Sequence, residues 1–288
     1  WLEQLIAEST GKHGKGLIPI DREALGKPEV YGNDRVFVHM HLGGAEDPDG
    51  RLKALEEKGH PVIHIAIEDS YQLGQLFYLW EIAIAMAGSV LGIDPFNQPD
   101  VEAAKVAARS LTDAFEKSGK LDESQPMFSD NNVRVYAGTN KNANGHNLTG
   151  ILKDHLSQVK DGDYFALLAF IEQTDTHNAA LQDMRLAVRD KKKVATCVEF
   201  GPRFLHSTGQ DYKGGPDSGV FLTITTDHAH KLPVPGRKID FGTVQLAQGM
   251  ADFSVLVERK RRALRVHLKD TDSGLRALNE AVAAALGA

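Results

Sequence analysis

The chain has 288 residues, of which 42% are hydrophobic and 25% charged, an ordinary globular composition. Acidic residues outnumber lysine and arginine by 39 to 33, and the resulting net charge of −6 argues against a dedicated nucleic-acid binder, which usually carries a basic face. The single cysteine, Cys197, excludes a disulfide framework and a cysteine-rich zinc site. The length is enough for one large domain or for two domains of roughly 100–150 residues.

The first residues, which include Trp1, Leu5 and Ile6, are apolar with helical spacing, and they predict a helix that ends near Glu8. Natural chains start with Met and seldom begin inside a helix, so we expect a fragment or a processed product. No signal peptide is visible at this end, and a cytoplasmic location is therefore expected.

The first half alternates short β-rich runs with helical patterns. Residues 36–42 and 61–67 predict strands, and residues 49–58 predict a helix between them. The longest apolar stretch, residues 73–91, is interrupted by polar side chains, which favours a buried helix over a membrane span. A further helix is predicted over residues 99–117. This alternation is typical of an α/β fold in which helices pack on a parallel sheet.

The polar, turn-rich residues 118–132 are the best candidate boundary, and they divide the chain into domains at 1–125 and 126–288. The second domain repeats the α/β pattern of the first. In this comparison, residues 93–96 of the first domain would form a strand that corresponds to residues 264–268 of the second. The alternative is that any two βαβ units look alike. The elements predicted after the boundary are strands over 133–137, 164–171, 193–200, 220–225 and 264–268, and helices over 148–159, 179–191, 243–259 and 274–286.

The first candidate for chemistry is the carboxylate of Glu8. It would lie where a helix ends, close to the negative end of the helix dipole, an environment that suits a general base. The alternative is a surface glutamate beside a turn. Residues 11–16, which follow, resemble a phosphate-binding loop only in composition, and a flexible basic turn is the simpler interpretation.

The second candidate is the pair formed by Gln98 and Lys105. Gln98 precedes the helix predicted from residue 99, and Lys105 lies seven residues later, on roughly the same helical face. An amide and an ammonium group that face one cleft suit a polyhydroxylated, partly anionic ligand. The alternative is an amphipathic helix with a solvated lysine.

Both segments resemble glucose-6-phosphate isomerases. Residues 7–12, Ala-Glu-Ser-Thr-Gly-Lys, look like the Met-Glu-Ser-Asn-Gly-Lys stretch that carries the catalytic base in that family. Residues 73–105 follow the family's C-terminal signature without a gap. The chain departs from the signature at Asn97, Pro99 and Asp100, which replace the family's Asp, Trp and Gly and alter the local loop.

The resemblance implies a flavodoxin-like sugar-isomerase (SIS) domain followed by a second α/β unit. It implies interconversion of glucose 6-phosphate and fructose 6-phosphate through a cis-enediol. Glu8 would move a proton between C2 and C1, and Lys105 would stabilise the charge of the enediolate. Gln4 and Gln98 would hydrogen-bond sugar hydroxyls. Neither a metal nor a cofactor is expected, since side chains supply proton transfer and charge stabilisation.

Residues 200–216 look like the C-terminal part of bifunctional transaldolase/glucose-6-phosphate isomerases. This resemblance implies that upstream isomerase and transaldolase domains, or a partner subunit, complete the site. The family's ring-opening histidine loop is absent here, so we expect His206 to substitute for it, with Ser207 and Thr208 contacting the substrate. The alternative for His206 is a structural hydrogen bond.

Two other classes of function compete with this interpretation. A non-catalytic sugar-phosphate-binding module of the same fold is the main alternative, although such a sensor needs no positioned proton shuttle like Glu8 with Lys105. An amidotransferase-type sugar isomerase lacks support, because Cys197 is far from any N-terminal position. Neither a nucleic acid nor a membrane is an expected partner.

Two groups of side chains have metal-ligand character. His39 and His41 share one face of a predicted strand, but packing in a core or cleft is the simpler interpretation. Asp227, His228 and His230 are more typical of an exposed loop.

Overall fold

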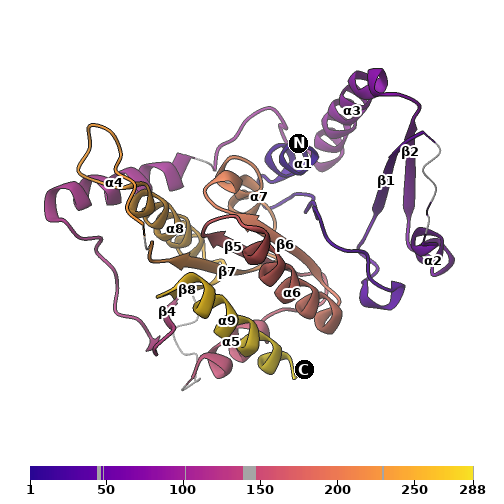
Figure 1. Ribbon diagram of the computed structural model, residues 1–288. Helices are drawn as coiled ribbons and strands as arrows, with labels where there is room; N and C mark the ends of the chain where they lie inside the picture. Colours follow the sequence, from indigo (N-terminus) through magenta and orange to yellow (C-terminus); the bar gives the residue numbers. More distant parts are fainter. Residues whose placement is uncertain (44–46, 48, 101, 139–146, 229, 288) are drawn as a thin grey trace.

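The computed structural model describes residues 1–43, 47, 49–100, 102–138, 147–228 and 230–287. Its described part contains a six-stranded sheet with helices on both faces and a separate two-stranded sheet, which confirms the α/β class (Figure 1). The large sheet belongs to the second half of the chain and the small sheet to the first.

The large sheet is mixed rather than purely parallel. Its order is β3-β4-β8-β7-β5-β6, in which β5 to β8 run parallel, β4 is antiparallel to β8, and β3 is antiparallel to β4. Within the parallel part the strands lie in the order β6-β5-β7-β8. Numbered along the chain, this order is 2-1-3-4, as in flavodoxin-like sheets. The strands are β3 (Phe128–Ser129), β4 (Val133–Ala137), β5 (Tyr164–Phe170), β6 (Ala195–Phe200), β7 (Gly219–Thr226) and β8 (Arg262–Leu268).

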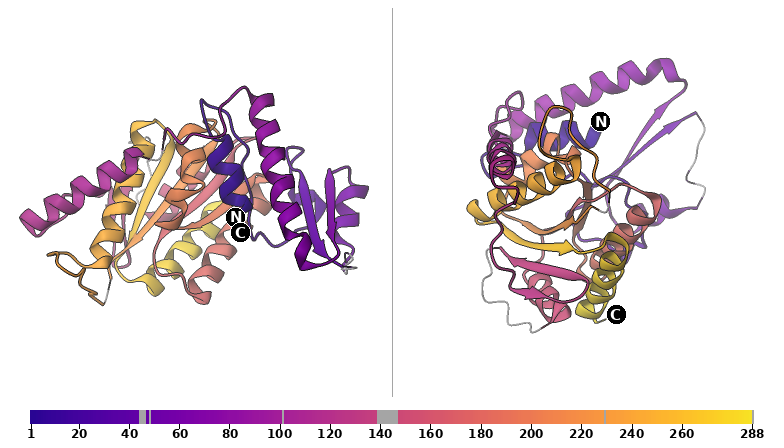
Figure 2. Two further views of the ribbon diagram at one scale, coloured as in Figure 1. Left: turned by 90° about the horizontal axis from the view of Figure 1, so that it is seen from above. Right: turned by 60° about the vertical axis from the view of Figure 1, so that its left-hand side comes forward.

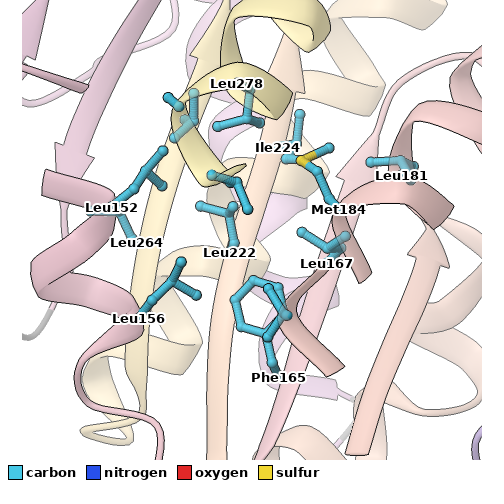
Figure 3. Close-up of a cluster of buried hydrophobic side chains, with 14 of the residues drawn as sticks. Leu152, Leu156, Phe165, Leu167, Leu181, Met184, Leu222, Ile224, Leu264 and Leu278 are labelled. Carbon is cyan, nitrogen blue, oxygen red and sulfur yellow. The ribbon is translucent and has the colours of Figure 1, made fainter. Parts of the chain in front are cut away.

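Alternate residues of β5 face two separate cores, because side chains alternate across a strand. Phe165 and Leu167 join the core beneath α5, α6 and α9, part of which Figure 3 shows. Tyr164 and Leu168 join the core on the other face, beneath α7 and α8. These helices are α5 (Leu148–Leu156), α6 (Asp175–Lys192), α7 (Gly209–Gly214), α8 (Phe241–Glu258) and α9 (Thr271–Leu286). Burial on both faces explains why β5 is continuously apolar.

The first half is built around the parallel pair β1–β2, in which Phe37 is paired with Val62. Helix α1 packs against α3 and also reaches α7 of the second half, so it lies between the two sheets (Figure 1). Helix α4 packs on α8, and Figure 2 shows it on the opposite side of the large sheet from β1 and β2. These elements are α1 (Leu2–Thr10), β1 (Phe37–Leu42), α2 (Arg51–Glu57), β2 (Val62–Ile67), α3 (Leu73–Leu91) and α4 (Glu102–Ser118).

The segment after α1 is anchored on the second half. Ile18 and Ile20 pack against the core beneath α7 and α8. Arg185 Nη1 donates to the carbonyl oxygen of Asp21 at 2.9 Å, and Arg189 Nη1 donates to Glu23 Oε1 at 3.2 Å. The boundary at residues 125/126 stays a prediction, but residues 18–24 contact the second half directly.

Helix α3 has the predicted bounds, but the prediction that it is buried is wrong. Only Ile84 and Gly88 are buried, whereas Met86 is 65% exposed and Val90 is 88% exposed. The narrow β1–β2 sheet and α1 offer too little surface to cover a helix that is apolar on most sides. In the described part of the chain, α3 with the preceding turn (Ser70–Leu91) is the one helix that could cross a membrane by length and composition, a test that core helices of soluble proteins also pass.

Three other expectations need correction. Residues 93–96 form a turn instead of a strand. Residues 209–214, between the strands predicted over 193–200 and 220–225, form the short helix α7, which was not predicted. Helix α6 begins at Asp175, four residues before the predicted start, because the Thr174 side chain accepts a hydrogen bond from the backbone N–H of His177 and caps the helix.

Candidate active site

Gln4 and Glu8 lie one turn apart on α1 and contact each other. Gln4 Nε2 donates to Glu8 Oε2 at 3.1 Å, with Gln4 exposed and Glu8 half-buried. The end of the helix is fixed by Thr10, whose hydroxyl donates to Ile6 O at 2.7 Å and accepts from the Leu17 N–H at 3.0 Å. Glu8 is therefore held on a rigid helix end and remains open to solvent.

The basic turn after α1 is fixed rather than flexible. The backbones of Lys12 and Lys15 exchange hydrogen bonds of 2.8 and 2.9 Å. The buried Lys12 Nζ donates to the Asp94 carbonyl oxygen at 2.8 Å, and Lys15 Nζ donates to the Leu91 carbonyl oxygen. Both ammonium groups thus lie at the C-terminal end of α3, where the helix dipole favours cations. They stabilise this helix end.

Three carboxylates are close enough to the buried ammonium group of Lys12 to affect its pKa. Burial lowers the pKa of Lys12, and the negative charges of Asp94, Glu8 and Asp100 oppose that shift. Asp94 and Asp100 come from the loop that precedes α4, whereas Glu8 comes from α1. The structure therefore brings the segment of Glu8 and the loop containing Gln98 to one place.

Gln98 lies in the loop before α4, and Lys105 lies in the helix itself. Gln98 is exposed in a loop held by Asp94, whose carboxylate accepts from the Phe96 N–H at 2.9 Å and from Asn97 Nδ2 at 3.0 Å. Lys105 is half-buried in the first turn of α4. Among the described residues, Lys105 makes no direct contact with Glu8.

Gln210 and Arg259 also reach this junction from the second half, and sequence reasoning missed both. Gln210 contacts Asp100 and the carbonyl oxygen of Gly11, and Arg259 Nη1 donates to Asp100 Oδ1. The basic run at residues 259–262 looks like a solvated helix end in the sequence, but Arg259 is paired with Asp100 and Arg261 is buried. Neither partner is close in sequence, so no local pattern indicates these contacts.

His206, Ser207 and Thr208 lie between β6 and α7 but differ in accessibility. His206 is exposed at the end of a 3-10 turn (Arg203–His206). The Ser207 hydroxyl is buried and donates to the Phe204 carbonyl oxygen at 3.3 Å, and Thr208 is fully buried. A substrate could reach His206 directly, whereas contact with the two hydroxyls would require this loop to move.

A buried acidic group, Glu199, lies close to this loop. Glu199, at the end of β6, accepts a hydrogen bond of 3.1 Å from the Tyr212 hydroxyl. Burial, reinforced by the charge of Glu3, raises the pKa of Glu199 to about 8. A cavity of about 300 Å³ opens beside Glu3 and is also lined by Trp1, Phe77 and Arg203, but Glu8 is not among its lining residues.

Cys197 is buried two residues before Glu199 on β6. Its thiol lies 3.7 Å from the Pro19 carbonyl oxygen, and burial raises its pKa to about 12.

Of the side chains with metal-ligand character, His39, His41 and Asp227 have other contacts. His39 and His41 stack with ring centroids 5.0 Å apart, and His39 Nδ1 lies 3.4 Å from His64 Nδ1. Asp227 pairs with Arg134 and His267, each at 3.2 Å. In the described part of the chain, no three His, Cys, Asp or Glu residues are grouped to hold a metal ion.

Comparison with known proteins relates part of the chain to one enzyme family. No protein-family model matches the chain. The glucose-6-phosphate isomerase of Leuconostoc mesenteroides is 30% identical over 149 residues, which cover 38% of this chain and 33% of that protein. The enzyme of Limosilactobacillus fermentum is 33% identical over 143 residues, covering 36% and 32%. That of Levilactobacillus brevis is 32% identical over 160 residues, covering 42% and 36%.

The chain spans about one third of the length of these curated relatives. The similarity to glucose-6-phosphate isomerases is thus confirmed for part of the chain, and the similarity to transaldolase fusions stays a prediction. A solved structure, a hypothetical protein from Thermus thermophilus, covers 86% of this chain and 55% of its own, with 13% identity and a TM-score of 0.42. That likeness is too loose to indicate a function.

Proposed function

We propose that this chain carries part of the active site of an aldose–ketose isomerase that interconverts glucose 6-phosphate and fructose 6-phosphate. The observation that carries the proposal is the bond from Lys12 Nζ to the Asp94 carbonyl oxygen. It joins the segment of Glu8 to the loop that leads to Lys105. The similarity of part of the chain to named glucose-6-phosphate isomerases supports the same activity.

In this proposal Glu8 transfers a proton between C2 and C1 on one face of the open-chain sugar. The hydrogen bond from Gln4 holds one oxygen of the Glu8 carboxylate, and no described residue hydrogen-bonds the other. Lys105 supplies a positive charge for the enediolate, which is the oxyanion that develops during the reaction. Gln98, exposed beside this junction, binds a sugar hydroxyl.

Other parts of the proposed site lie outside these segments. His206 opens the sugar ring, and Ser207 and Thr208 contact the substrate after a movement of their loop. Upstream isomerase and transaldolase domains, or a partner subunit, complete the site within a bifunctional cytoplasmic enzyme. The partial coverage of the curated relatives supports the need for further protein around the sugar phosphate.

The test is Glu8→Gln in the whole protein, with the formation of glucose 6-phosphate from fructose 6-phosphate followed by a coupled dehydrogenase. Loss of the general base is expected to lower kcat by about 100-fold or more, while calorimetry shows sugar-phosphate binding within a few-fold of the unchanged protein. The exposed Glu29, replaced by Gln, is the matched control and keeps full activity.

Full turnover by the Glu8→Gln variant would remove Glu8 as the base. Binding of sugar phosphate without turnover by the unsubstituted protein would favour the non-catalytic binding module.

A further inference from the structure

Gln210 joins two segments that lie about 90 residues apart in the sequence. Its side chain is fully buried in α7. Its Nε2 donates to the Gly11 carbonyl oxygen at 2.8 Å and to Asp100 Oδ2 at 2.9 Å. Its Oε1 accepts the backbone N–H of Asp100 at 3.0 Å. One amide group is therefore shared between the residue just after α1 and the loop just before α4.

The two segments and α7 are packed so closely around Gln210 that there is no space for an added carbon atom on Gly214. A Cβ atom on Gly214 would lie 2.3 Å from Asp100 Oδ2, 2.7 Å from the Gly11 carbonyl oxygen and 2.9 Å from Gln210 Nε2. The Gly14 N–H also donates to the Gly214 carbonyl oxygen at 2.9 Å. Both segments thus rest directly on the backbone of α7.

Arg259 holds the same junction from the end of α8. Its Nη1 donates to Asp100 Oδ1 and, at 3.1 Å, to the Lys213 carbonyl oxygen. The guanidinium balances the charge of the largely buried Asp100 carboxylate, whose other oxygen is bound by Gln210. Asp100 is therefore fixed from two elements of the second half.

We propose that Gln210 is a positioning residue for the isomerase reaction. It sets the separation between Glu8, three residues before Gly11, and Lys105, five residues after Asp100. This inference rests on the proposed function and extends it, since it assigns the second half the role of aligning the base with the cation. Alignment matters because a displacement of about 1 Å can cost about 100-fold in rate.

The first test is kinetic. Gln210→Met keeps the length of the side chain but removes its hydrogen bonds, and it is expected to lower kcat about 10- to 100-fold while KM changes less than about threefold. The matched control is Gln158→Met. Gln158 Nε2 lies 3.4 Å from His155 Nδ1 beside α5, on the other face of the large sheet from α7, so this variant keeps its kcat. An unchanged kcat in Gln210→Met would overturn the inference.

The second test needs no activity. Amide hydrogen exchange is expected to become about tenfold faster over residues 11–15 and 98–100 of Gln210→Met and to stay unchanged in β5. The Asp100 N–H is the direct reporter, because it donates to Gln210. Unchanged exchange in both segments would also overturn the inference.

Two further outcomes separate the inference from the proposed function. If the unsubstituted protein has no isomerase activity, the proposed function and the positioning role of Gln210 both fail, although hydrogen exchange still measures how firmly Gln210 holds the two segments. If it is active and Gln210→Met retains kcat, only the positioning role fails.

If hydrogen exchange also becomes faster throughout β5 of Gln210→Met, the substitution has disturbed the whole fold. Arg259→Met is then used in its place. That variant releases Asp100 from the partly exposed side and is expected to lower kcat in the same direction, and an unchanged kcat refutes the inference.

Discussion

At the scale of single residues, burial decides the properties of Glu199. Its pKa of about 8 in the folded protein lies above the ordinary value of 4.5 in the unfolded chain. The folded state therefore keeps the proton that the unfolded state loses, and stability falls as the pH rises from about 4.5 to about 8. Glu199→Gln removes this dependence, so the variant should lose roughly 2–4 kcal/mol less than the unsubstituted protein between pH 5 and pH 8.

Urea unfolding of both proteins at the two pH values measures this difference. A glutamine at position 199 still accepts the hydrogen bond from Tyr212, so the variant is expected to fold. The exposed Glu280, replaced by Gln, is the control and keeps the normal pH dependence. Equal slopes for Glu199→Gln and the unsubstituted protein would contradict the assignment.

At the scale of elements, α3 shows what a local pattern can predict. Its bounds follow from the apolar run and from Gly92, which ends the helix in the left-handed conformation. Its burial depends on neighbours that the local pattern does not specify. Likewise, β4 to β8 are predicted to within a few residues, whereas the two-residue strand β3 is missed within the polar stretch 118–132. Helix α7 escapes prediction because it is short and polar.

The exposed face of α3 should tolerate charged side chains. Replacing Met86 and Val90 together by Glu should change the free energy of unfolding by less than about 0.5 kcal/mol, since both side chains already face solvent. The fluorescence of a bound apolar dye should decrease. The matched variant is Ile84→Glu on the buried side of the same helix, which should cost more than about 3 kcal/mol. Similar losses in both variants would contradict the exposed face.

At the scale of the whole molecule, Glu23 ties the first half to the second. Its side chain is almost buried, accepts from Thr196 Oγ1 at 2.8 Å and pairs with Arg189 at 3.2 Å. Glu23→Ala would leave Arg189 without this partner and should lower the free energy of unfolding by about 3 kcal/mol. Glu29→Ala, which breaks an exposed pair with Lys58 at 3.9 Å, should cost less than about 1 kcal/mol.

Two probes of urea unfolding test this connection. Both tryptophans, Trp1 and Trp80, lie in the first half, whereas the large sheet dominates the circular dichroism of the second. We expect the two transitions to coincide in the unsubstituted protein. Separate transitions, with the Glu23→Ala effect confined to fluorescence, would mean that the halves unfold independently.

The candidate site illustrates the limit of sequence reasoning at this same scale. Two short segments match the spacing of glucose-6-phosphate isomerase motifs without a gap, and this match is enough to single out Glu8 and Lys105 as candidates. Gln210 and Arg259 cannot be found in that way, because their partner Asp100 lies 110 and 159 residues away from them. The sequence around Lys12 predicts a mobile surface cation, since nothing in its turn indicates the Asp94 carbonyl group that binds it.

The burial of Cys197 has a practical consequence. At neutral pH its thiol is almost entirely protonated. Reagents that react with thiolates will therefore modify it very slowly. A cysteine introduced at an exposed position such as Phe96 would then be the only reactive sulfur in the chain. Fluorophores or spin labels can thus be attached beside the proposed catalytic junction without first mutating the native cysteine.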